Sequence, residues 1–103
     1  MWVRIARFEG GTADAIEAET ENTKRQLAQA RTSGPPPGLE GVKRVVEGVD
    51  RNRGAGVSLV FCDNEDDIQK AHQALDAMSP SSQDSGRRAS VDIYEVVTDE
   101  DMA

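Results

Sequence analysis

The stretch Val46–Phe61, VEGVDRNRGAGVSLVF, joins two apolar segments through a short polar turn and so indicates the fold. The turn combines Arg51 and Arg53 with Gly54 and Gly56, a composition that also suits a phosphate-binding loop. Such loops lead into a helix, whose free backbone amides and positive dipole meet the anion. This loop leads into GVSLVF, which has the composition of a strand, so we interpret it as a hairpin turn in which Gly54 adopts the left-handed conformation.

Strand and helix signals alternate on both sides of this hairpin. A strand at 2–8 ends at two glycines, and a helix of about 20 residues follows with Thr12 as its N-cap. SGPPPG at 33–38 ends that helix, because proline cannot donate a backbone hydrogen bond. The remaining elements are strands at 41–49 and 56–62, a helix at 64–78, the polar loop SPSSQDSG at 79–86 and a strand at 88–97. The order β-α-β-β-α-β predicts an α+β, ferredoxin-like fold, in which a four-stranded antiparallel sheet carries two helices on one face.

Length, charge and cysteine content limit the possible functions. The 103 residues suffice for one domain, 1–103, and we expect 98–103 to be a flexible acidic tail. The net charge of −7 disfavours binding to nucleic acid or anionic membranes, and no apolar run approaches the roughly 20 residues of a membrane span. The first residues are too charged for a secretion signal, so we expect a cytoplasmic protein. With Cys62 alone, the chain forms no internal disulfide.

Both faces of the predicted sheet are apolar. Side chains alternate along a strand, so odd and even positions belong to different faces. We expect the helices to cover the odd positions: Val3, Ile5, Val57, Leu59, Phe61, Val91 and Ile93. The even positions would then form a second face that no element of this chain covers: Trp2, Arg4, Ala6, Phe8, Ser58, Val60, Cys62, Ser90, Asp92, Tyr94 and Val96. An apolar face of that size predicts a homodimer in which the two sheets face each other.

The element order, the strand-to-helix passage VSLVFCDNEDDIQKAHQAL and the closing ASVDIYEVV resemble the dimeric α/β barrel superfamily, in particular its antibiotic biosynthesis monooxygenase-like branch. The resemblance covers essentially the whole chain. It implies homodimers with a cavity between sheet and helices or between the two sheets. It also implies either cofactor-independent oxidation of a small aromatic or quinol-type substrate by molecular oxygen, or haem degradation, although many members have no known activity.

Six residues are the candidates for a site. His72 is the only histidine and lies on or beside the apolar stripe of the second helix, where it suits acid-base chemistry. For a phenolic substrate, Trp2 would provide an aromatic wall, Arg4 a cation for the phenolate, Tyr94 a hydroxyl and Asp92 a carboxylate, with Ser58 as a further polar group. The alternative is structural: Trp2 and Tyr94 pack in an interface, while Arg4 pairs with Asp92 across strands.

Cofactors and metals are not expected. Haem-degrading relatives resemble this chain in carrying a histidine on the second helix, but they also carry an asparagine on the first strand and a tryptophan near the start of that helix. Neither residue is present here. The acidic clusters DNEDD and TDEDMA lack the spacing of a calcium-binding loop. Two hypotheses therefore remain, a cofactor-independent monooxygenase and a non-catalytic ligand-binding or assembly module of the same fold.

Overall fold

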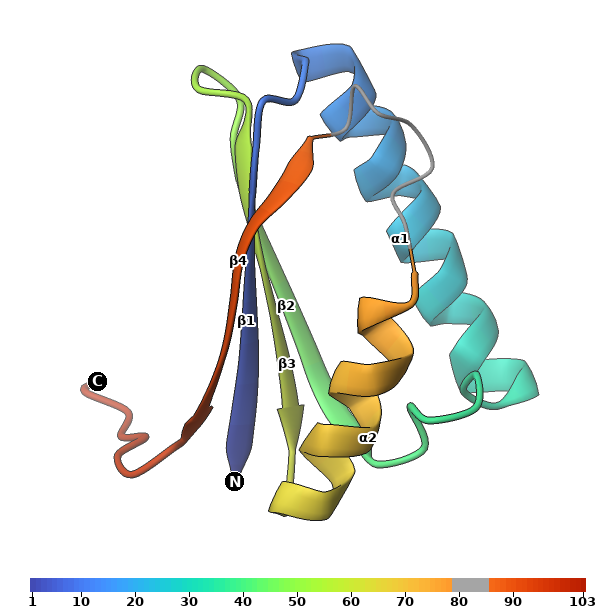
Figure 1. Cartoon of the computed structure of the whole chain (residues 1–103), viewed down its shortest axis with the longest axis vertical. Helices are drawn as coiled ribbons and strands as arrows, with labels where there is room; N and C mark the ends of the chain where they lie inside the picture. Colours follow the sequence, from blue (N-terminus) through green and yellow to red (C-terminus); the bar gives the residue numbers. More distant parts are fainter. Residues whose placement is uncertain (79–85) are drawn as a thin grey trace.

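A computed structural model describes residues 1–78 and 86–103, and the element order is the predicted one. The loop prediction for 79–86 lies almost wholly outside these residues. The elements are β1 (Trp2–Glu9), α1 (Ala13–Ser33), β2 (Val42–Asp50), β3 (Ala55–Cys62), α2 (Glu65–Asp76) and β4 (Arg87–Glu95). The strands form one antiparallel four-stranded sheet in the order β2-β3-β1-β4, and both helices lie on one side of it (Figure 1). The α+β, ferredoxin-like prediction is therefore confirmed.

The hairpin between β2 and β3 forms as the sequence predicts. The Asp50 carboxylate accepts hydrogen bonds from the backbone amides of Asn52 at 3.1 Å and Arg53 at 3.2 Å. Gly54 has φ +65°, and its carbonyl accepts a hydrogen bond of 2.9 Å from the amide of Gly11. A Cβ at Gly54 would collide with the Gly11 carbonyl oxygen, so both the backbone conformation and the close approach require glycine here.

Side-chain caps start both helices. The Thr12 hydroxyl accepts a hydrogen bond from the amide of Ala15 at 3.3 Å, and the Asn64 side chain accepts one from the amide of Asp67 at 2.8 Å. α1 buries only Ile16, whereas α2 buries Ile68 and Ala71. The core therefore lies between α2 and the sheet.

The helices cover the even-numbered side chains of β1 and β3, whereas the sequence predicted that they would cover the odd-numbered ones. Cys62, Ile68 and Ala71 form the buried cluster, and Trp2 and Ile93 pack against it. The even residues of β1 and β3 thus face the helices, while the odd residues of β4 do so as predicted. The reason is the register: Arg4 pairs with Val60 on one side and with Ile93 on the other, so even positions share a face with even positions of β3 but with odd positions of β4.

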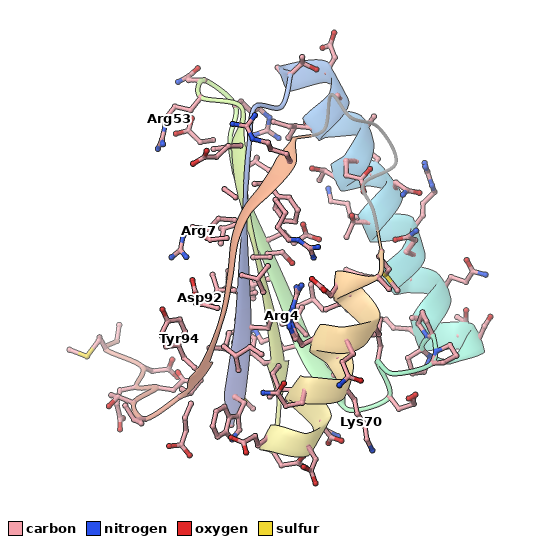
Figure 2. The ribbon with its side chains drawn as sticks, viewed as in Figure 1. Arg4, Arg7, Arg53, Lys70, Asp92 and Tyr94 are labelled. Carbon is pink, nitrogen blue, oxygen red and sulfur yellow. The ribbon has the colours of Figure 1, made fainter. Side chains whose placement is uncertain are left out.

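Among residues 1–78 and 86–103, no helix lies over the opposite side of the sheet, and we call this side the open face. Its members follow from the register and are Val3, Ile5, Arg7, Arg44, Val46, Gly48, Asp50, Ala55, Val57, Leu59, Phe61, Ser90, Asp92 and Tyr94. Figure 2 shows Arg7, Asp92 and Tyr94 pointing away from the helices. The sequence predicted one sheet face without a helix over it, and the described elements leave one such face, although it is formed by other residues of β1 and β3 than predicted.

Two further features concern the helices and the C-terminal segment. Within residues 1–78 and 86–103, no helix is both long and apolar enough to cross a membrane. After β4, the amide of Val96 donates a hydrogen bond of 2.9 Å to the carbonyl of Met1, and residues 98–103 are exposed without regular structure.

Candidate functional site

Arg4 of β1 is a buried cation. Its side chain points toward the helices (Figure 2), and the residue is only 3% exposed. Its Nε donates a hydrogen bond of 3.1 Å to Nδ1 of His72, which is half-buried on α2. The strand and the helix thus bring together two of the residues that the sequence singled out as catalytic candidates.

The direction of this hydrogen bond fixes the state of His72. A guanidinium has only donors, so the accepting Nδ1 must carry a lone pair. His72 is therefore a neutral imidazole with its proton on Nε2. Because the Nδ1 lone pair is occupied by Arg4, Nε2–H is the group that His72 can offer to a ligand, as a hydrogen-bond donor.

A second guanidinium lies close to the first. Arg88 of β4 forms an ion pair of 3.0 Å with the carboxylate of Asp76 at the end of α2. Burial lowers the pKa of Arg4 most, the positive charge of Arg88 lowers it further, and the negative charge of Asp76 opposes both. Asp76 is thus close enough to act on Arg4 electrostatically, yet its direct partner is Arg88.

The charges of this cluster do not balance. Arg4 and Arg88 contribute two positive charges, Asp76 contributes one negative charge, and the His72 imidazole is neutral. Within residues 1–78 and 86–103, no carboxylate forms an ion pair with Arg4. Buried charges in proteins are normally paired, because leaving water costs several kcal/mol. An unpaired buried guanidinium is suited to binding an anion.

The other predicted site residues divide between the two faces. Trp2 packs against the core cluster on the helix side, and the register places Ser58 on the same side, opposite Ala6. Tyr94 and Asp92 lie on the open face, where Tyr94 is 54% exposed and Asp92 pairs with Arg7 at 3.7 Å. The sheet therefore separates them from Arg4, and the suggested pairing of Arg4 with Asp92 is wrong.

Three residues of the helix side were missed by sequence reasoning. Arg88 and Asp76 complete the charge cluster, and Asp76 follows His72 by four residues, a spacing that places both on one side of α2. Glu47 of β2 is the third. Its register places it opposite Ser58, and its pKa is raised, first by partial desolvation and second by the negative charge of Glu19 on α1. In the sequence, Glu47 could have been recognised as a carboxylate between apolar positions of a predicted strand.

The open face has a groove at one end. Its volume is about 420 Å³, and its walls come from the sheet and from both chain ends: Met1, Arg44, Val46, Leu59, Phe61, Val96, Thr98 and Asp99. The Arg44 guanidinium lies 5.9 Å from the centre of the Phe61 ring, a cation–π distance. This groove contains one cation and no histidine, so the richer chemistry lies on the helix side.

Metal-binding side chains do not gather in the described part of the chain: there, no three His, Cys, Asp or Glu residues could hold an ion together. Comparisons of the chain with protein-family models, with curated proteins and with solved structures each returned no match.

Proposed function

We propose that the protein binds a small aromatic or quinol-type molecule as its anion, with the ionised oxygen at Arg4. The observation that carries this proposal is the buried Arg4 guanidinium. Within residues 1–78 and 86–103, its hydrogen bond goes to the neutral imidazole of His72, and no carboxylate forms an ion pair with it. An anionic oxygen beside Arg4 would balance the excess positive charge of the cluster. The Nε2–H of His72 supplies a second donor for the same ligand.

The reaction that this site supports is oxidation of the bound phenolate by molecular oxygen without a cofactor, as the resemblance to antibiotic biosynthesis monooxygenase-like proteins implies. The positive charge of Arg4 favours the ionised, electron-rich form of the substrate, which is the form that O₂ oxidises. One oxygen atom enters the ring, and the other leaves as water with the phenolic and ring hydrogens, so a phenol becomes a quinone. His72 acts here as a donor to the substrate oxygen, because Arg4 occupies its Nδ1.

A pair of ligands with the same shape tests the binding step. 2-Naphthoate is an anion at neutral pH, and 2-naphthamide is its neutral counterpart. Binding can be followed by the fluorescence of Trp2, the only tryptophan, which lies on the helix side with Arg4. A hydrogen bond to a charged group contributes about 1.5–3 kcal/mol, so Arg4→Met should weaken naphthoate binding about 10- to 100-fold.

The control variant is Arg7→Met, on the same strand but on the open face. It should leave naphthoate binding unchanged, and naphthamide should bind the wild type and Arg4→Met equally. Equal naphthoate affinity in Arg4→Met and wild type would contradict the proposal.

Oxygen uptake then separates the enzyme from a non-catalytic ligand-binding module. With 1-naphthol as substrate, the monooxygenase hypothesis predicts O₂ consumption above the rate in buffer, in equal amount to the quinone formed. Arg4→Met should abolish that excess. Naphthoate binding that depends on Arg4, without any oxygen uptake, would instead establish the ligand-binding module.

A further inference from the structure

Arg88 reaches the helix side of the sheet through a β-bulge. Along most of β4 the odd residues face the helices, so a regular strand would turn the even residue Arg88 to the open face. The register between β1 and β4 shifts between Arg7 and Phe8, and Phe8 is paired with Arg88 instead of Ala89. Ala89 is thus the extra residue of the bulge, and it moves Arg88 to the helix side. Bulges often redirect a side chain beside a functional site.

The two guanidiniums of the helix side contact α2 one turn apart. Arg4 donates a hydrogen bond of 3.1 Å to His72, and Arg88 pairs with the Asp76 carboxylate at 3.0 Å. Four residues of a helix span about 6 Å along its axis, and residues at this spacing lie on one side of it. Two cations are therefore presented next to each other along α2, which suits a ligand with two anionic groups on one edge.

We propose that Arg88 is a second ligand-binding cation, so that the preferred ligand is an aromatic dianion with its two acidic groups on neighbouring ring carbons. This inference rests on the proposed function, because Arg4 binds the first anionic group. Arg88 binds the second group in place of the Asp76 carboxylate, which turns into water. Two guanidiniums then neutralise two anionic groups.

The ion pair between Arg88 and Asp76 is suited to exchange with a ligand. The Asp76 side chain is 56% exposed, and surface ion pairs of this kind contribute little stability. Asp76 is also the last residue of α2, where the helix dipole disfavours a carboxylate and the last turn contains no basic residue. The Arg88 Nη2 donates a further hydrogen bond of 3.4 Å to the Asp76 backbone carbonyl. The guanidinium therefore keeps a contact with α2 when the carboxylate leaves.

Three naphthalenes separate the roles of the two cations. 2,3-Naphthalenedicarboxylate carries its charges on neighbouring carbons, 2,6-naphthalenedicarboxylate carries the same charges at opposite ends, and 2-naphthoate carries one charge. Calorimetric titration at pH 7.5 measures their affinities. The parent protein for the comparison is the Asp76→Asn variant. In the wild type, Arg88→Met would leave the Asp76 carboxylate without its partner and near enough to act on Arg4.

Arg88→Met in this parent should weaken binding of 2,3-naphthalenedicarboxylate about 10- to 100-fold, the loss expected for a hydrogen bond to a charged group. Binding of 2,6-naphthalenedicarboxylate and 2-naphthoate should change by less than about threefold. Arg87→Met is the matched control, because Arg87 is the adjacent residue of β4, pairs with Glu9 and lies on the opposite side of the strand. It should leave all three affinities unchanged.

Two outcomes would overturn the role of Arg88. One is 2,3-naphthalenedicarboxylate binding that Arg88→Met leaves unchanged, and the other is an equal loss for both dicarboxylates, which would show an effect of net charge alone. Naphthoate binding that still depends on Arg4 would then leave the proposed function standing. If instead Arg4→Met weakens none of the three ligands, the proposed function fails, and this inference fails with it.

Discussion

Replacing Arg4 by methionine should stabilise the protein. Dehydrating a guanidinium costs several kcal/mol even in a relaxed protein. Its hydrogen bond to His72 returns only about 1.5–3 kcal/mol, and Asp76 is already paired with Arg88. Methionine has a similar length and no charge, so it removes the dehydration cost and keeps the apolar contacts. The variant leaves Nδ1 of His72 without its donor, which costs about 1 kcal/mol at a half-buried position.

The balance is a rise in the free energy of unfolding of about 1–2 kcal/mol, and each kcal/mol raises Tm by about 4–8 °C in a domain of this size. Urea unfolding followed by Trp2 fluorescence measures it. Arg7→Met is the control, since Arg7 is exposed and should change stability by less than about 0.5 kcal/mol. A loss of about 2 kcal/mol or more in Arg4→Met would show instead that the buried guanidinium stabilises the fold.

Three more predictions concern other positions. The raised pKa of Glu47 means that the folded state holds its proton more tightly than the unfolded state, so stability falls as pH rises above about 4.5. Glu47→Gln should therefore be more stable than wild type at pH 7. The gain should be only a few tenths of a kcal/mol because solvent screens an exposed side chain, and thermal melts should show no difference below pH 4. Gly34→Ala introduces backbone strain alone and should lower the free energy of unfolding by about 1–2 kcal/mol. Gly54→Ala adds a collision with Gly11 and should cost at least about 1 kcal/mol more in urea unfolding. Equal losses in the two variants would contradict the hairpin geometry. Burial raises the pKa of the Cys62 thiol, so alkylation by iodoacetamide at pH 8 should require unfolding, and rapid labelling of the native protein would contradict this.

Local signals predicted the elements of the fold. Thr12 and Asp50 act through side-chain hydrogen bonds to neighbouring amides, and Gly54 through its own backbone conformation, so each can be recognised in a short stretch of sequence. The assignment of faces failed because it depends on register. Arg4 pairs with an even residue on β3 and an odd residue on β4, and those pairings arise between distant segments. With apolar residues on both faces, composition could not show which face the helices cover.

The candidate site was predicted in part for the same reason. Arg4 and His72 come together because α2 covers the even face of β1, whereas Tyr94 lies on the far side of the sheet. Arg88 and Asp76 join the site through a contact between β4 and α2 that no short-range pattern indicates. A lone histidine marked the right helix, and the residues around it became apparent only from the packing.

The hydrogen bond between Arg4 and His72 holds the strand and helix parts of the site together, and the imidazole nitrogen resonances of His72 report on it directly. His72 is the only histidine, so its nitrogen signals in a ¹⁵N-labelled protein need no assignment by mutation. Long-range proton–nitrogen correlation at pH 7.5 should show one neutral tautomer with the proton on Nε2 and Nδ1 accepting a hydrogen bond, and Arg4→Met should shift the Nδ1 resonance. A proton on Nδ1, or nitrogen resonances that Arg4→Met leaves unchanged, would show that Arg4 does not donate to His72.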